Sequence, residues 1–188
     1  MIQPNSDHGG GISEEILTEV MQLHAEVSRQ SDLLTSELGS LLVCRLGCDG
    51  CCQDDLAVFP IEAEIIRRHC EPLLTFDQAH PPGKCAFLDA EGACRIYPWR
   101  PYVCRTQGLP LRWLGDGQDE ERGICELNAE ELERQGTRLD QLPAEQCWTI
   151  GEVESRLAGL QVRALGTFQE TLPRIKLRDL FTTYPEQP

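Results

Sequence analysis

The clustering of cysteines constrains this chain more than any other feature of its sequence. Nine of its ten cysteines fall between Cys44 and Cys125, a stretch of 82 of the 188 residues. The first residues are polar and glycine-rich and lack the basic start and apolar run of an export signal. In the cytosol the thiol pool keeps disulfides reduced, so clustered thiols favour metal binding or redox chemistry over a disulfide framework.

The length and the net charge limit the number of domains and the classes of protein to which this chain can belong. At about 100 to 200 residues per domain, 188 residues predict one domain with tails. The formal net charge is −14, which argues against the polybasic surface that nucleic-acid binding requires. No stretch approaches the roughly 18 consecutive apolar residues of a membrane span. We therefore expect a cytoplasmic protein that binds neither nucleic acid nor membrane.

The N-terminal part predicts a tail followed by a long helix. Residues 1–11 are polar and aperiodic, which predicts a disordered tail. Residues 12–43 carry one apolar stripe that opens at Ser13, which predicts an amphipathic helix with a break near Ser31. Such a stripe packs in the core or forms a homodimer or another protein interface. His24 lies in the stripe, and we expect it to pack rather than bind metal.

Shorter helices are expected further along the chain. Pro60 is placed to begin a helix that runs to Cys70. Residues 71–93 contain several prolines and glycines, which predict a loop. Asn128, with an acid three residues later, predicts the start of a short helix that ends near Gln135.

The C-terminal region, residues 126–188, is expected to pack on the same domain. Thr149 and Glu152 predict a capping box for a helix that ends near Ala164, and residues 172–181 predict a partly docked tail. The expected fold class is therefore mainly α. It is a small, irregular, metal-stapled domain whose cysteine-rich loop core is flanked by N- and C-terminal helices.

The first thiols occupy a loop that brings sulfur atoms together. Cys44, Cys48 and Cys51 are separated by three and two residues, and the intervening glycines let the backbone curl. A fourth ligand has to come from a later position. The candidates are Cys52, Cys85, Cys94, Cys104 and Cys125.

Thiolate ligands favour zinc or an iron–sulfur cluster over calcium or magnesium. Ligand type alone leaves zinc and a cluster both open. The number of sites is open too, because the adjacent Cys51 and Cys52 either serve two sites or supply a single ligand. Eight cysteines suffice for two four-thiolate sites, although one site is the simpler count.

Two segments carry a resemblance to a known family. CRLGCDGCC and KCAFLDAEGACRIYPWRPYVCR, followed by a cysteine in GICELN, resemble the YkgJ-like cysteine-cluster family, a CxxCxxCC-type zinc- or iron-chelating domain. The resemblance covers residues 44–125 and implies metal binding without one established reaction. The cysteines it implies as metal ligands are Cys44, Cys48, Cys51, Cys52, Cys85, Cys94, Cys104 and Cys125.

This chain departs from the family pattern in a few places. Three residues separate its first two cluster cysteines, where the family usually has two. Cys70 and Cys147 match no family position, and we expect them to be small buried apolar residues.

Enzyme families share part of the pattern. Flagellin lysine-N-methylase has a similar cluster, but this chain is short for that protein and shows no glycine-rich turn for a nucleotide-like cofactor. The first spacing also coincides with radical S-adenosylmethionine enzymes, which usually have an aromatic residue where this chain has Gly50. An iron–sulfur-dependent enzyme, methylase-like or redox, stays an alternative. So does an interaction module with a purely structural zinc.

Arginines surround the later cysteines without acidic neighbours. Those between Gly92 and Trp113 are Arg95, Arg100, Arg105 and Arg112. A divalent ion or 2+ cubane held by four thiolates carries a net charge of −2, which guanidinium groups offset. We therefore expect Arg95, Arg100 and Arg105 to support the bound metal or cluster. The alternatives are an anion site for a substrate phosphate or carboxylate, and a solvated surface.

Overall fold

The computed structural model describes residues 11–45, 47–117, 119–167 and 169–181. In these residues it is mainly helical, which confirms the expected fold class. The helices are α1 (Glu14–Leu38), α2 (Pro60–Phe76), α3 (Tyr102–Arg105), α4 (Glu126–Arg134) and α5 (Glu152–Leu165). The strands are β1 (Ala57–Val58), β2 (Leu111–Leu114), β3 (Glu120–Gly123), β4 (Trp148–Thr149) and β5 (Ile175–Lys176). Apart from Gly11, the tail predicted at residues 1–11 lies outside the described residues.

Helix α1 begins as predicted and runs unbroken to its end. Ser13 caps it, because its Oγ accepts a hydrogen bond from Ile16 N at 3.4 Å. The break predicted near Ser31 is wrong, since this residue is buried in a continuous helix and no Gly or Pro interrupts it. The apolar stripe packs inside the chain against α2 and α5. Dimerisation through this helix stays a prediction.

A buried polar pair joins α1 to α2 and to the start of α3. His24 Nε2 lies 3.0 Å from Glu62 Oε1, and both side chains are almost completely buried. The same carboxylate oxygen accepts a hydrogen bond from Tyr102 N at 2.8 Å. Because α3 carries Cys104, this pair fixes the backbone close to one of the predicted ligands.

Glu62→Ala is expected to lower the free energy of unfolding by about 2–4 kcal/mol, because it leaves the Tyr102 N–H and the His24 ring without their buried partner. Glu64→Ala is the matched control on the same helix. It removes a partly exposed ion pair with Arg68 and should cost about 0–1 kcal/mol. Urea denaturation measures both. Equal losses would mean that the buried pair contributes no more than a surface one.

Helix α2 begins at Pro60 as predicted but continues past the predicted end. The backbone at Cys70 is non-helical, with φ −123° and ψ 21°, and the helical segment resumes to Phe76. This kink accommodates Pro72, which lacks an N–H and would clash with the carbonyl four residues earlier in a straight helix. The loop predicted from residue 71 therefore begins only after α2.

Helices α4 and α5 exist where capping signals predicted them, but both start at other residues. Cys125 is the N-cap of α4, and Asn128 lies within the helix with its side chain bonded elsewhere. Helix α5 follows Gly151, whose N–H donates to Glu154 Oε2 at 2.7 Å. Thr149 belongs to β4 instead. Gly151 has φ +110°, a conformation that favours glycine and sets the turn into α5.

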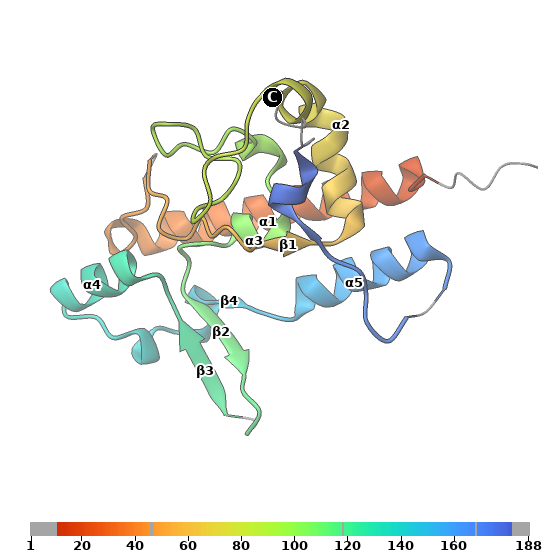
Figure 1. Ribbon diagram of the computed structural model, residues 1–188. Coiled ribbons are helices and arrows are strands. Elements are labelled where there is room, and N and C mark those ends of the chain that lie inside the picture. Colours follow the sequence, from red (N-terminus) through yellow and green to blue (C-terminus); the bar gives the residue numbers. More distant parts are fainter. Residues whose placement is uncertain (1–10, 46, 118, 168, 182–188) are drawn as a thin grey trace, which may run out of the picture.

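Two small sheets join distant parts of the chain, and sequence patterns predicted neither. β2 pairs antiparallel with β3 and parallel with β4, and this sheet projects from the helices (Figure 1). β1 pairs with β5. The residues after β5 are docked, since Leu177, Leu180 and Phe181 are buried. This confirms the docked tail predicted at 172–181.

The core has two main clusters, and one of them includes the cysteine-rich loops. The first is built from α1, the start of α2 and α5. The second packs the rest of α2 and the docked C-terminal residues against Phe87, Cys85 and Cys94. Within the described residues, no helix is both long and apolar enough to cross a membrane.

Candidate metal centre

The loop of residues 44–52 is folded by two consecutive turns. Cys48 N donates to Arg45 O at 2.9 Å, and Cys52 N donates to Asp49 O at 2.9 Å. Gly47 has φ +84°, which an L side chain rarely adopts. The two turns therefore offer thiols at short intervals along the chain, as the spacing predicted.

Five cysteines form one group, which we call the inner thiols. They are Cys51, Cys52, Cys85, Cys94 and Cys104. Cys85 N donates to Cys52 O at 3.0 Å, so the loop after α2 lies directly against the first loop. Cys94 is fixed by a β-bridge to Leu88, and Cys104 lies in α3. Cys52, Cys85 and Cys94 pack in or against the second core cluster, and Cys104 neighbours Cys85 and Cys94.

The adjacent Cys51 and Cys52 belong to the same group of thiols. The mutual influence of the neighbouring Cys51 and Cys52 thiols lowers the pKa of Cys51 to about 6 and raises that of Cys52. Burial raises the pKa values of Cys85, Cys94 and Cys104. In Cys104 the neighbouring Cys85 and Cys94 raise it further. Ionising all of these thiols therefore requires a positive charge among them.

Three other cysteines form a second group, which we call the outer thiols: Cys44, Cys48 and Cys125. Burial raises the pKa of Cys44, and the nearby Cys125 and Cys48 raise it further. Cys44 is exposed and the other two are half-buried. The two groups together contain the eight cysteines that were predicted as ligands.

Asn128, which the sequence suggested only as a helix cap, and Gly108 hold Cys44 in place. Asn128 is fully buried, and its Nδ2 donates to Gly108 O at 2.6 Å and to Cys44 Sγ at 3.3 Å, while its Oδ1 accepts from Val43 N at 2.9 Å. A Cβ at Gly108 would lie 2.6 Å from Cys44 Sγ. No local signal reveals this role, because the partners are between 20 and 85 residues away along the chain.

The remaining two cysteines are buried apolar residues, as expected. Cys70 packs in the second core cluster and Cys147 with Leu132 and Leu142 in a small third one. All ten cysteines are free thiols in the structure.

Arg100 faces the inner thiols. Its charge lowers the pKa values of Cys51, Cys94 and Cys104. The guanidinium stacks over the Tyr97 ring at 3.8 Å from its centroid. Its buried Nε has no hydrogen-bond partner among the described residues. An Arg100 N–H that has no acceptor among the described residues, next to partly ionised thiols, is suited to hydrogen-bond a negatively charged metal–thiolate or iron–sulfur centre.

The guanidinium groups of Arg95 and Arg105 already form some hydrogen bonds to other parts of the chain. Arg95 Nη2 donates to the carbonyl oxygens of Gln78 and Ala86, each at 2.9 Å. Arg105 Nη1 donates to Ser28 Oγ at 2.7 Å. Burial, followed by the charge of Arg100, lowers the pKa of Arg105 to about 10. The Nε atoms of Arg95 and Arg105 are also buried without a partner in the described residues.

Arg112 lies apart from this arrangement. Its guanidinium pairs with Glu120 at 2.9 Å and donates to Thr149 Oγ1 at 2.9 Å. The acid that was missing from its sequence neighbourhood is supplied by β3.

The donor set fits a thiophilic metal, although the side chains are not closed around one point. Among the described residues, no three Cys, His, Asp or Glu side chains already lie in a group that could hold an ion. The sulfur ligands, together with the unpartnered arginine donors, match zinc or an iron–sulfur centre rather than calcium or magnesium.

Comparison with known families agrees with this chemistry. Residues 43–133 match the family model CxxCxxCC, described as "Putative zinc- or iron-chelating domain". This segment is a CxxCxxCC domain. The match contains both thiol groups and most of α4, and it confirms the resemblance seen in the sequence. No curated protein and no solved structure matches the chain.

The docked C-terminal segment braces the CxxCxxCC domain from outside the matched residues. Arg178 donates to Asp54 Oδ1 at 2.6 Å, to His80 O at 2.7 Å and to Lys84 O at 2.9 Å. Asp54 Oδ2 also accepts from Gly83 N at 2.9 Å. Arg178 thereby ties the two loops that lead to Cys52 and Cys85.

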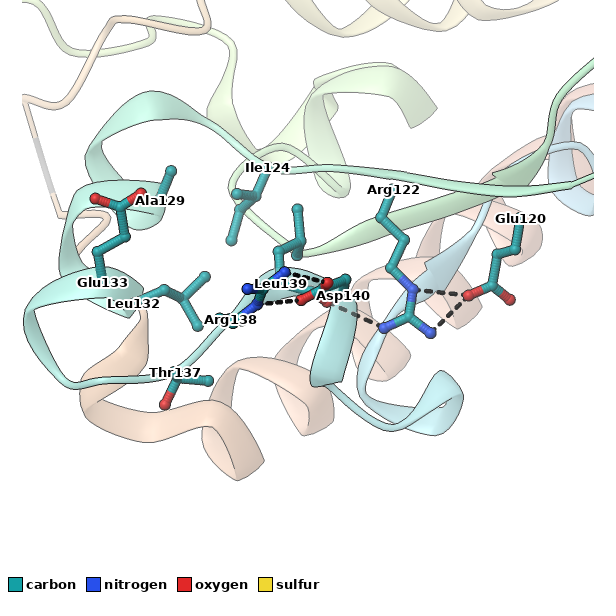
Figure 2. A pocket seen from close by; sticks show the side chains of 10 residues that line it. All are labelled: Glu120, Arg122, Ile124, Ala129, Leu132, Glu133, Thr137, Arg138, Leu139 and Asp140. Atoms are coloured by element: carbon teal, nitrogen blue, oxygen red, sulfur yellow. Dashed lines mark hydrogen bonds and ion pairs between the residues drawn. The ribbon is translucent and has the colours of Figure 1, made fainter.

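A hollow of about 610 Å³ lies elsewhere, between β3, α4 and the turns that follow α4 (Figure 2). Its lining residues are Glu120, Arg122, Ile124, Ala129, Leu132, Glu133, Thr137, Arg138, Leu139 and Asp140. Arg122 donates to the carbonyl oxygens of Leu139 and Leu142, and Arg138 donates to Asp140 at 2.9 Å. The guanidiniums in this hollow are thus already paired, and its lining includes no cysteine. The candidate site lies at the thiols.

Proposed function

We propose that the CxxCxxCC domain binds a metal ion or an iron–sulfur cluster through its inner thiols. The observation that carries this proposal is that Cys52, Cys85 and Cys94 pack in or against the second core cluster, while the buried Nε of Arg100 has no partner among the described residues. Cys85, Cys94 and Cys104 each supply one ligand, and the adjacent Cys51 and Cys52 supply the fourth. The bound group would tie these loops together as a zinc staple or supply electron transfer as a cluster.

The chain's own residues prepare this site. Cys51 supplies a thiolate at neutral pH because its pKa is lowered to about 6. The buried Cys85 and the half-buried Cys94 lose their protons when a cation takes the proton's place. Arg100 offsets the negative charge that four thiolates leave over, and its Nε, which has no partner in the described part of the chain, can donate to a sulfur.

Metal and acid-labile sulfide analysis, with a visible spectrum of protein purified without oxygen, tests the proposal. Zinc without sulfide identifies a structural zinc domain, whereas iron with matching sulfide and visible absorption identifies a cluster. Protein that folds fully with neither metal nor sulfide would reject the proposal.

A second candidate function is an enzyme that binds an anionic substrate at the arginines. The observation in its favour is that Arg100 and Arg105 are neighbours with like charges and that each has a buried Nε without a partner in the described residues. A phosphate or carboxylate would satisfy both groups.

Arg100→Gln separates the two candidates. If Arg100 supports the bound centre, losing its charge should weaken metal retention by about 1.5–3 kcal/mol, the range for a hydrogen bond to a charged group. That is about tenfold to a hundredfold in affinity. Arg112→Gln is the matched control, because its guanidinium is paired with Glu120 away from the inner thiols. Competition with a chromogenic chelator gives the affinities. Unchanged metal affinity, with loss of phosphate binding, would favour the enzyme.

A further inference from the structure

The C-terminal segment, residues 175–181, packs beside the candidate metal centre although it lies outside the CxxCxxCC match. Its strand β5 pairs with β1, and Leu177 N donates to Leu56 O at 2.9 Å. Leu177 and Phe181 are buried in the second core cluster, which also contains Cys85. Figure 1 shows the segment next to α2. Residues that the family model does not include therefore form part of the core that surrounds an inner thiol.

Arg178 of this segment is bonded to both loops that carry inner thiols. Its Nε donates to Asp54 Oδ1 at 2.6 Å, two residues after Cys52. Its Nη atoms donate to His80 O at 2.7 Å and to Lys84 O at 2.9 Å, on the loop after α2. A guanidinium is planar and its N–H donors point in fixed directions. These bonds therefore form together only when the two loops have one relative position.

The peptide group between Lys84 and Cys85 is held at both of its polar atoms. Its oxygen accepts from Arg178, and its N–H, which belongs to Cys85, donates to Cys52 O at 3.0 Å. Because a peptide group is planar, these two bonds fix its orientation. They thereby limit the directions in which the Cys85 side chain can leave the chain. Arg178 thus acts on this thiol through the backbone.

We infer that Arg178 is a positioning residue for the inner thiols and that it couples metal binding to docking of the C-terminal segment. The inference rests on the proposed function, since it concerns the same metal site. A metal bound to Cys85 and to the Cys51 and Cys52 pair would hold together the two loops that Arg178 holds. Each event therefore favours the other, and thermodynamic linkage requires the two effects to be equal in size.

Zinc affinity of the full chain, measured under reducing conditions by competition with a chromogenic chelator, tests the inference. Arg178→Gln should bind zinc about 5- to 150-fold more weakly than wild type, the usual range for coupled sites. Lys176→Gln is the matched control, because it removes the same charge from the same segment. It loses only a pair with Asp55 in which both side chains are more than half exposed. This control should bind zinc as wild type does.

Amide hydrogen exchange of wild type measures the coupling in the other direction and requires no variant. Removal of zinc should speed exchange at Leu177 N by about the factor by which Arg178→Gln weakens zinc binding, because this amide reports docking of the segment on Leu56 O. Amides of α1 should exchange at the same rate with and without zinc. A residue that only stabilised the fold would not make Leu177 respond to zinc.

Other results overturn the inference. If Arg178→Gln binds zinc as tightly as wild type, or if Lys176→Gln loses as much affinity, Arg178 does not position the thiols. If zinc removal leaves exchange at Leu177 unchanged, docking of the segment is not coupled to the metal, however well the variant folds. Failure of the proposed function is distinct from these results, because wild type itself would then retain no metal.

Discussion

Removal of the metal by a chelator under reducing conditions is expected to disorder the cysteine-rich loops while the helical core persists. The cluster formed by α1, α5 and the start of α2 contains no cysteine and should remain folded. The loops around Cys52, Cys85 and Cys94 have little regular secondary structure, so their order depends on the bound group. Structural zinc contributes about 10–16 kcal/mol in peptides that fold only with metal, and several kcal/mol are expected here.

Amide hydrogen exchange with and without chelator measures this effect residue by residue. Amides of residues 44–56 and 77–100 should lose protection, and those of α1 should keep it.

Acid should have the same effect, because protons compete with metal for the thiols. Burial raises the pKa values of Cys85 and Cys94, so their metal affinity should fall with decreasing pH from a higher pH than for exposed thiols. Unchanged protection in both loops after metal loss would contradict the stapled fold.

Cys104→Ser is expected to lose the inner metal. Cys104 neighbours Cys85 and Cys94 and lies at the end of a chain segment that Glu62 fixes through Tyr102 N. Serine is a poor ligand for thiophilic metals, so affinity should fall more than a hundredfold, which corresponds to about 3 kcal/mol or more.

Cys147→Ser is the matched control for this prediction. Cys147 is also buried, but it packs with Leu132 and Leu142 away from both thiol groups. Its replacement should leave the metal content unchanged and cost about 1–3 kcal/mol for the buried hydroxyl. Metal content after gel filtration decides the comparison. If Cys147→Ser released the metal and Cys104→Ser retained it, the assignment of ligands by family position would be wrong.

Local sequence patterns succeeded where structure depends on neighbours along the chain. The apolar stripe from residue 12 and the cap at Ser13 predicted α1, and Pro60 marked the start of α2. The capping patterns at Asn128 and Thr149 placed their helices correctly but not their first residues. In both cases the side chain that the local pattern assigned to the helix cap instead forms a hydrogen bond with a residue far away in the sequence.

The two thiol groups could not have been predicted from spacing. Cys48 and Cys51 are three residues apart, yet Cys48 is a neighbour of Cys44, whereas Cys51 is a neighbour of Cys52 and Arg100. Their separation follows from the two turns in the loop and from α4 and the loop after α2 packing on either side. Likewise, the basic segment from Arg95 to Arg112 divides, because Glu120 on β3 pairs with its last member.

The sequence by itself determined which chemistry this protein can perform, because the identity of the donor atoms is local. A set of clustered thiols with nearby arginines selects thiophilic metals however the chain folds. Only the tertiary structure decided which thiols are neighbours, which arginine faces them, and that Asn128 and Gly108 hold Cys44. Those facts depend on contacts between residues tens of positions apart, and loop closure and packing set such contacts rather than any periodicity in the chain.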